Sequence, residues 1–173
     1  MFTFDEKLRE EIEDICREII KLRKLREKLE IGSPEYRRIC QMISRLKRKL
    51  RELLGTKIIP HWLISQIEKE LEEKRELTYE DFKKYFKKMI EKIENKLKKF
   101  EWISLPILLQ YFNDFISLYG FNELDLEKFE NYLSKFIKEI GYIPMKEEID
   151  EITNKNVKLI NIKFLIRKLS RLG

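Results

Sequence analysis

Apolar side chains recur along the chain with helical spacing, beginning with two matched stretches near the N-terminus. In residues 5–30 the apolar positions alternate steps of four and three, which is the a/d pattern of a coiled-coil seam. These positions are Leu8, Ile12, Ile15, Ile19, Leu22 and Leu29, and Arg26 takes one expected slot. A second seam follows at Ile39, Ile43, Leu46, Leu50 and Leu53. Because Gly32, Ser33 and Pro34 separate the two seams, the pattern predicts an antiparallel helical hairpin over residues 1–57.

The next stretch, residues 58–121, has the pattern of a helical core. We expect Pro60 to begin a short helix, and Thr78 with Asp81 to form a capping box before another. The apolar stripe of that next helix is Phe82, Phe86, Met89, Ile93, Leu97 and Phe100. The segment from Ser104 to Gly120 is apolar nearly all round, which predicts a helix at the centre of the core. Polar residues interrupt it, so we expect no membrane span.

The last stretch, residues 122–173, predicts three helices with two breaks. The first runs from about Asp125 to Ile140 and ends at Gly141, after which the residue before Pro144 disfavours helix. We expect a short helix over 145–152, with Ile149 and Ile152 facing inward, and a final helix over 157–172. These elements predict a helix-turn-helix-like unit, and the whole chain is predicted to be all-α.

Charge is unevenly distributed over a chain that is 39% charged with a net charge of +6. Residues 101–156 hold 5 basic and 11 acidic residues, whereas residues 157–173 hold 5 basic residues and no acidic one. A helix with this charge suits a phosphate-lined groove, where Asn reads adenine and Arg reads guanine. The alternative is a solvated basic face beside a helix C-terminus. The candidate nucleic-acid-binding residues are Lys158, Asn161, Lys163, Arg167, Lys168 and Arg171.

A second basic cluster lies in the second helix of the predicted hairpin. Arg45, Arg48 and Lys49 are within one helical turn of one another and away from the apolar seam. They are further candidates for phosphate contacts. Basic clusters on coiled-coil arms are also typical solvated flanks, and the sequence leaves both interpretations open.

The stretch "FIKEIGYIPMKEEI" resembles the DNA-binding domain of LexA-type winged-helix repressors, in which an Ile-rich helix runs into "GYPPT-x-x-EI". Gly141, Tyr142, Pro144, Glu148 and Ile149 are the matching residues. The resemblance implies that the family's third helix, which lies in the DNA major groove, corresponds to Val157–Leu172. The chain ends where the wing strands of the family would follow, so we expect no wing. Nothing in the sequence matches the self-cleaving serine–lysine domain of the family.

Catalytic and metal-binding motifs are missing from the sequence. No phosphate-binding Gly-rich loop, zinc-protease motif or nucleophile elbow occurs, so we expect neither an enzyme nor a cofactor. His61 is the one histidine and has no neighbouring ligand for a metal. Cys16 and Cys40 lack CxxC spacing, which favours two thiols in a reducing, cytoplasmic compartment. Heavy use of Lys and Glu is typical of thermophiles.

Two functional hypotheses follow. The first is a non-catalytic DNA-binding protein of the transcription-regulator type, with duplex DNA preferred over RNA. The final helix would contact DNA, and the hairpin would mediate dimerisation or add phosphate contacts. The second is a helical interaction subunit of a replication or other nucleoprotein complex. Residues 33–54 resemble the helical domain of archaeal GINS replication subunits, although the small β-domain of that family has no counterpart here.

Overall fold

The computed structural model describes residues 6–55 and 61–172, which form eight helices and a small three-stranded sheet. The chain is mostly helical, as the sequence predicts, but the all-α prediction is wrong in leaving out the sheet. The chain divides into two compact units. Unit 1 comprises residues 1–74 and 118–120, and unit 2 comprises residues 75–117 and 121–173. The predicted boundary at 57/58 and the helix start at Pro60 lie outside the described residues.

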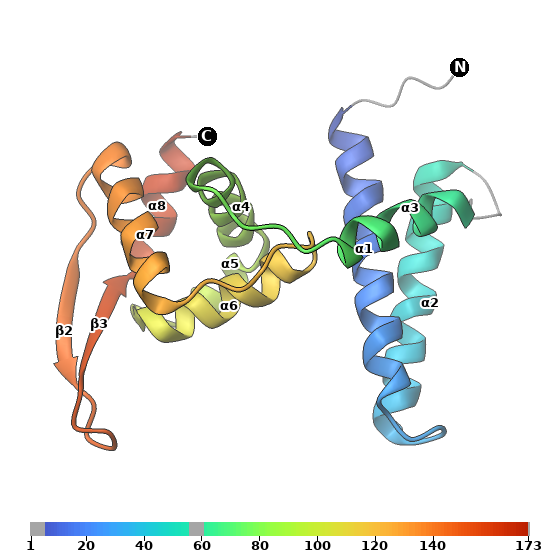
Figure 1. Ribbon diagram of the computed structural model, residues 1–173, viewed down its shortest axis with the longest axis horizontal. Helices are drawn as coiled ribbons and strands as arrows, with labels where there is room; N and C mark the ends of the chain where they lie inside the picture. Colours follow the sequence, from blue (N-terminus) through green and yellow to red (C-terminus); the bar gives the residue numbers. More distant parts are fainter. Residues whose placement is uncertain (1–5, 56–60, 173) are drawn as a thin grey trace. The chain divides into compact units, whose positions relative to one another are not determined.

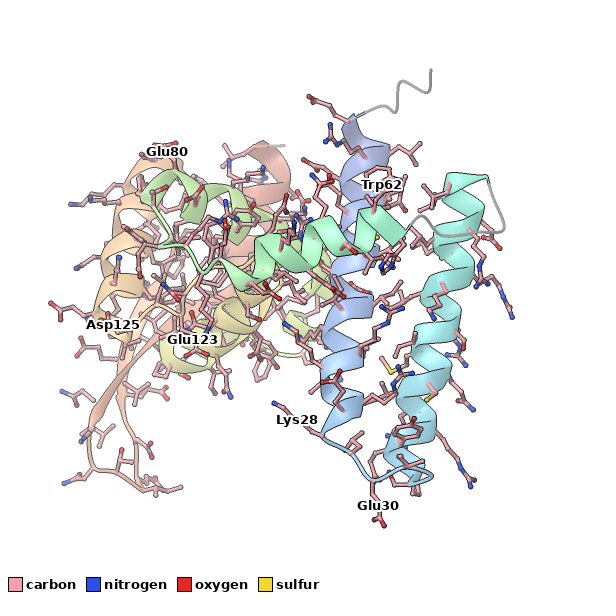
Figure 2. The ribbon with its side chains drawn as sticks, turned by 45° about the vertical axis from the view of Figure 1, so that its right-hand side comes forward. Lys28, Glu30, Trp62, Glu80, Glu123 and Asp125 are labelled. Carbon is pink, nitrogen blue, oxygen red and sulfur yellow. The ribbon has the colours of Figure 1, made fainter. Side chains whose placement is uncertain are left out.

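Unit 1 consists of α1 (Glu6–Glu27), α2 (Pro34–Leu54) and α3 (His61–Glu72). Helices α1 and α2 lie side by side and run in opposite directions, and the turn between them carries Lys28 and Glu30 (Figures 1 and 2). Ser33 starts α2 because its side-chain oxygen accepts a hydrogen bond from the backbone N–H of Tyr36 at 3.2 Å. Gly55 ends α2 in the left-handed conformation.

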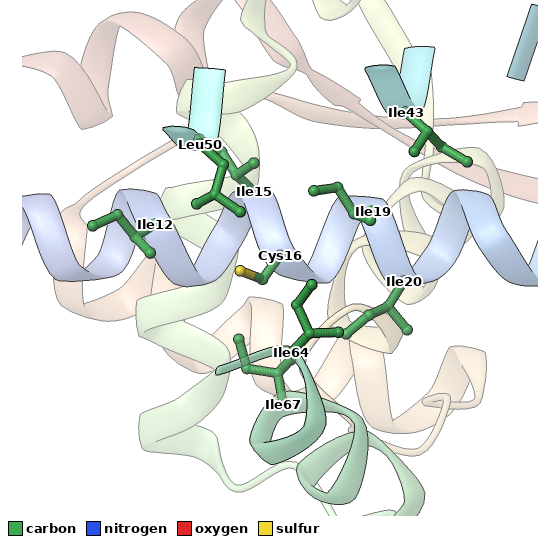
Figure 3. Close-up of a cluster of buried hydrophobic side chains, with 9 residues drawn as sticks. All are labelled: Ile12, Ile15, Cys16, Ile19, Ile20, Ile43, Leu50, Ile64 and Ile67. Carbon is green, nitrogen blue, oxygen red and sulfur yellow. The ribbon is translucent and has the colours of Figure 1, made fainter. Parts of the chain in front are cut away.

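The core of unit 1 is aliphatic and centres on α1 (Figure 3). Ile15 faces Leu50 of α2, whereas Cys16 and Ile20 face α3. Helices α2 and α3 thus cover two faces of α1, so α1 buries more residues than a single a/d seam would. The buried set is Ile12, Ile15, Cys16, Ile19, Ile20, Ile43, Leu50, Ile64 and Ile67.

The short segment 118–120 completes unit 1, although it follows a helix of unit 2. The Tyr119 hydroxyl donates to Oδ1 of Asp14 at 2.9 Å, and the Arg17 guanidinium lies 4.7 Å from the centre of the Tyr119 ring. Gly120 has φ of +79°, and a Cβ there would lie 2.9 Å from the carbonyl oxygen of Glu70. Glycine is therefore required for this close approach to α3.

Unit 2 is built around an aromatic core. Its helices are α4 (Tyr79–Lys92), α5 (Glu94–Leu97), α6 (Leu105–Ser117), α7 (Leu126–Ile140) and α8 (Ile162–Leu172). The predicted capping box is confirmed: Thr78 and Asp81 exchange hydrogen bonds at the start of α4. Five fully buried rings from α4, α6 and α7 meet with centroid separations of 5.2–6.4 Å: Phe82, Phe86, Phe112, Phe129 and Phe136.

The sheet of unit 2 consists of β1 (Trp102–Ser104), β2 (Met145–Ile149) and β3 (Asn156–Asn161), all antiparallel, in the order β1-β3-β2. Ile103 of β1 pairs with Ile160 of β3, and both are buried. Strands β2 and β3 form a hairpin that projects from the helices (Figure 1). Its turn is held by the side chain of Asp150, which accepts from the backbone of Ile152, and by Asn154 at φ of +56°.

Two sequence-based predictions in this region are therefore wrong. Residues 145–149 form a strand where we predicted a short helix, and Ile149 and Ile152 are 65% and 94% exposed rather than inward-facing. The final helix begins at Ile162 and not at Val157, because 157–161 belong to β3. Over five or six residues a helical and an alternating apolar pattern are hard to distinguish, and here the pairing of β3 with β1 buries Ile160. Strands β2 and β3 precede α8 in the chain.

Candidate nucleic-acid interface

Helix α8 positions most of the predicted cations. Asn161 caps it, because the Asn161 side-chain oxygen accepts from the backbone N–H of Phe164 at 3.0 Å. Ile162 and Leu165 are fully buried and fix the rotation of the helix. The other faces carry basic side chains and no acidic one. We call Lys163, Arg167, Lys168 and Arg171 the α8 face.

The α8 face is not neutralised within the part of the chain that the structure describes. None of its four cations forms an ion pair with a described carboxylate. Lys163, Arg167 and Arg171 are exposed, and Lys168 is half-buried. Lys168 lies against the end of α7, where a Cβ on Gly141 would come within 2.8 Å of its Nζ atom. This cationic surface is therefore available for an external anion.

A groove between α5 and α8 extends the α8 face. Its volume is about 560 Å³, and Lys163, Arg167 and Lys98 contribute positive charge to it. Ile166 and Ser170 also line it, together with Glu94, whose carboxylate lies 3.6 Å from the Lys98 ammonium. A smaller hollow of about 90 Å³ on α8 is lined by Phe164, Arg167, Lys168 and Arg171. An elongated anion would find cations on both sides of Arg167.

Sequence reasoning missed Lys98. We expected one apolar stripe to continue from Phe82 to Phe100, but α4 ends at Lys92 and the chain turns at Ile93 into the separate helix α5. That turn brings Lys98 to α8. The basic run "KLKKF" over residues 96–100 was the available signal, although it gives no indication of the turn.

Two predicted site residues lie elsewhere. Lys158 is in β3, and its ammonium lies 3.2 Å from Oε2 of Glu130 on α7, so its charge is already paired. Asn161 is half-buried and occupied as the cap of α8. Both were assigned to a helix that in fact begins after them, and neither joins the α8 face.

The candidates on α2 belong to unit 1. Arg45, Arg48 and Lys49 are all exposed. Lys49 lies 3.9 Å from a carboxylate oxygen of Glu11 on α1, whereas Arg45 and Arg48 have no carboxylate partner among the described residues. These cations belong to unit 1, whereas the α8 face belongs to unit 2.

The remaining surface of unit 2 has a mixed charge. The outer side of α7 exposes Asn131, Ser134, Lys135 and Lys138 along one stripe, with Glu127 and Glu139 beside it. The β2–β3 hairpin adds Glu147, Glu148 and Glu151, all exposed. Cations without acidic neighbours are therefore a property of α8 and not of the unit as a whole.

Metal and membrane chemistry find no support in the described ranges. No group of three or more His, Cys, Asp or Glu side chains within 6–55 and 61–172 is arranged to hold a metal ion. Among the same residues, no helix has the length and apolarity needed to cross a bilayer. Cys16 and Cys40 are both free thiols.

Comparisons of the chain with protein-family models, with curated proteins and with solved structures found no match.

Proposed function

We propose that the protein binds duplex DNA, without catalysis, through the α8 face. The observation that carries this proposal is the group of four cations on one helix that no described carboxylate neutralises. Positive charge held in this way attracts a polyanion, because contact with phosphates releases the counterions condensed on DNA.

The dimensions of α8 suit this role. An 11-residue helix is about 16 Å long, which spans several phosphates along a groove about 12 Å wide. Lys98 lies across the groove from Lys163 and Arg167, but its ammonium is 3.6 Å from the Glu94 carboxylate, so it is not counted with the α8 face. If the four cations of the α8 face all met phosphates, log K would fall against log salt with a slope of about −3.6.

The resemblance to winged-helix domains remains part of the proposal, but different helices of this chain now correspond to those of the family. Three helices, α4, α6 and α7, precede the β2–β3 hairpin, just as three helices precede the wing in that family. In this correspondence the third helix is α7, and its exposed stripe from Asn131 to Lys138 becomes a rival DNA-contacting surface. Glu127, Glu139 and the acidic β2–β3 hairpin flank that stripe. Their negative charges repel phosphates, which favours α8 as the DNA-contacting helix.

A pair of charge-matched variants tests the proposal. Lys163→Ala with Arg167→Ala removes two cations from the α8 face, and Lys135→Ala with Lys138→Ala removes two from α7. Binding of a short fluorescent duplex is followed by anisotropy over a series of salt concentrations. We expect the α8 variant to lose about tenfold or more in affinity at low salt and to reduce the salt slope by about 1.8.

The outcome distinguishes the two helices. The α7 variant is expected to keep most of the affinity and nearly all of the slope. A larger loss for the α7 variant would move the interface to α7, and absence of duplex binding by the wild-type chain at low salt would remove the DNA hypothesis. Repeating the series with single-stranded RNA distinguishes the preferred nucleic acid.

The second candidate is an interaction subunit of a larger nucleoprotein assembly. Exposed apolar side chains on and beside the β2–β3 hairpin favour it, because Tyr142, Ile149 and Ile152 are 75%, 65% and 94% exposed. In this case Ile149→Ser with Ile152→Ser would abolish assembly with a fixed partner and leave DNA affinity unchanged. The α1–α2 pair would serve either hypothesis through dimerisation or through Arg45 and Arg48.

A further inference from the structure

A group of cations distinct from every predicted site residue lies on α1 and α2 of unit 1. We call Arg23, Arg26, Lys47 and Arg51 the α1–α2 cluster. Arg23 and Arg26 are three residues apart on α1, and Lys47 and Arg51 are four apart on α2. Residues with these separations share one side of a helix, so each helix presents a pair of cations.

A contact between Arg26 and Cys40 relates the two pairs to each other. Nη1 of Arg26 lies 3.8 Å from Sγ of Cys40, which places Arg26 against α2. Because the helices run antiparallel (Figure 1), Ile19, seven residues before Arg26, lies level with Lys47, seven residues after Cys40. Arg23 is one turn from Ile19, and Arg51 is one turn from Lys47. In this register the four cations follow one another over eleven residues of the helix pair, about 16 Å, in the order Arg26, Arg23, Lys47 and Arg51.

The cluster is held against the protein surface and is not extended into solvent. Arg23, Arg26 and Lys47 are half-buried, and only Arg51 is exposed. Burial lowers the pKa of Lys47, and the neighbouring charges of Arg23, Arg26 and Arg51 lower that pKa further. Like charges are therefore close enough to repel one another at a place where water screens them incompletely.

The cluster has no acidic partner within the described part of the chain, since none of its members forms an ion pair with a described carboxylate. Two other arginines of α1 are paired: Arg9 lies 3.3 Å from Glu13, and Arg17 lies 3.5 Å from both Asp14 and Glu70. Helix α2 has seven cations and two acidic residues, so it has too few carboxylates to pair with its own cations.

We propose that the α1–α2 cluster is a binding site for a phosphate-bearing polyanion. Three guanidinium groups and one ammonium present forked donors that match phosphate oxygens, and the ligand would remove the repulsion among them. Phosphates of a nucleic-acid backbone and of a free polyphosphate share this chemistry. The site goes beyond DNA binding by α8, because it lies in the other unit and uses other residues.

The test measures thermal unfolding of the full chain with tripolyphosphate and with sodium chloride at equal ionic strength. The cluster variant is Arg23→Gln with Lys47→Gln. The matched control is Arg37→Gln with Arg38→Gln, which removes the same charge from exposed positions on α2. We expect tripolyphosphate to raise Tm of the wild-type and control proteins well above the salt effect. The cluster variant should bind about tenfold more weakly and lose most of this shift.

A tripolyphosphate effect equal to that of salt, or an equal loss in the control, would overturn the proposal. Circular dichroism without ligand confirms that each variant is folded, and Arg51→Gln alone provides a milder test. Duplex DNA in place of tripolyphosphate identifies a nucleic-acid source if the cluster variant also has a smaller salt slope. The Lys163→Ala, Arg167→Ala variant should keep the part of the tripolyphosphate shift that the cluster variant loses, so failure of the α8 proposal remains distinguishable.

Discussion

The two units hold their positive charge in physically different ways. In unit 1 the α1–α2 cluster is mostly half-buried, and its members repel one another. In unit 2 three of the four cations of the α8 face are exposed and surrounded by water. The net charge of a segment therefore does not show whether its cations are close enough to repel one another or are simply exposed to solvent. The distinction depends on how the helices pack, and it predicts that removing a charge stabilises unit 1 and has little effect on the stability of unit 2.

The cores of the units differ in a similar way. Unit 1 buries aliphatic side chains along a helix pair, where each contact is repeated along the seam. Unit 2 concentrates its stability in a small set of aromatic rings around Phe82, which has centroid separations of 5.2 Å to both Phe86 and Phe112. Loss of one ring should therefore affect unit 2 more than loss of one aliphatic side chain affects unit 1.

The largest expected effect is that of Phe82→Ala. Phe82 is fully buried and contacts rings from three helices, so we expect a loss of about 4 kcal/mol in the free energy of unfolding. Leu50→Ala in unit 1 should cost about 3 kcal/mol, and Tyr142→Ala, at an exposed position, less than about 0.5 kcal/mol. Guanidinium unfolding followed by circular dichroism measures all three. A greater loss for Leu50→Ala would contradict the comparison.

The difference between local and long-range contacts explains how much of the molecule the sequence predicts. The seams of α1 and α2, the cap at Thr78 and the extent of α7 follow from periods and caps that are local in the chain. Strand β3 depends on Ile103, more than fifty residues earlier, and that pairing decides the conformation of a run that also fits a helix. The α8 face was predicted by composition, but Lys98 and the pairing of Lys158 with Glu130 depend on tertiary structure.

The second expected effect is alkaline destabilisation through Cys16. Burial raises the pKa of this thiol from 9.0 to about 11. The unfolded chain ionises first, so the stability contributed by the neutral thiol is complete below pH 9 and is lost as the pH rises towards 11. The loss is on the order of 2 kcal/mol. Denaturant unfolding at several pH values, with Cys16→Ala as the reference, isolates it, and parallel pH curves for the two proteins would refute the assignment.

The third, smaller effect is the loss of stability when a helix cap is removed from each unit. Thr78 and Asp81 cap α4 reciprocally, whereas Ser33 accepts one hydrogen bond, from the backbone N–H of Tyr36, at the start of α2. We expect Thr78→Ala to cost about 1.5 kcal/mol and Ser33→Ala about 1 kcal/mol. Both are measured by thermal unfolding. Asp81→Ala should cost less than Thr78→Ala, because it removes the bond from the Thr78 backbone N–H but keeps the bond from the Asp81 backbone N–H to the Thr78 hydroxyl. A negligible cost for Asp81→Ala would show that the reciprocal bond contributes little.

The smallest expected effect is the most direct test of the difference between the units. Lys47→Met removes a cation that lies among three others, and its methylene stem is replaced by an apolar side chain of similar length. We expect the free energy of unfolding to increase by about 0.5 kcal/mol at low salt, since each like-charge contact destabilises by a few tenths. Arg167→Met on the α8 face should change it by less than about 0.3 kcal/mol, because Arg167 is exposed and solvent screens its repulsion with the cations beside it. Added salt should shrink the gain at position 47, as it screens the same repulsion. A loss of stability in Lys47→Met at every salt concentration would mean that the packing of the lysine stem contributes more than the repulsion among the cations. The α1–α2 cluster would then be an ordinary basic helix surface.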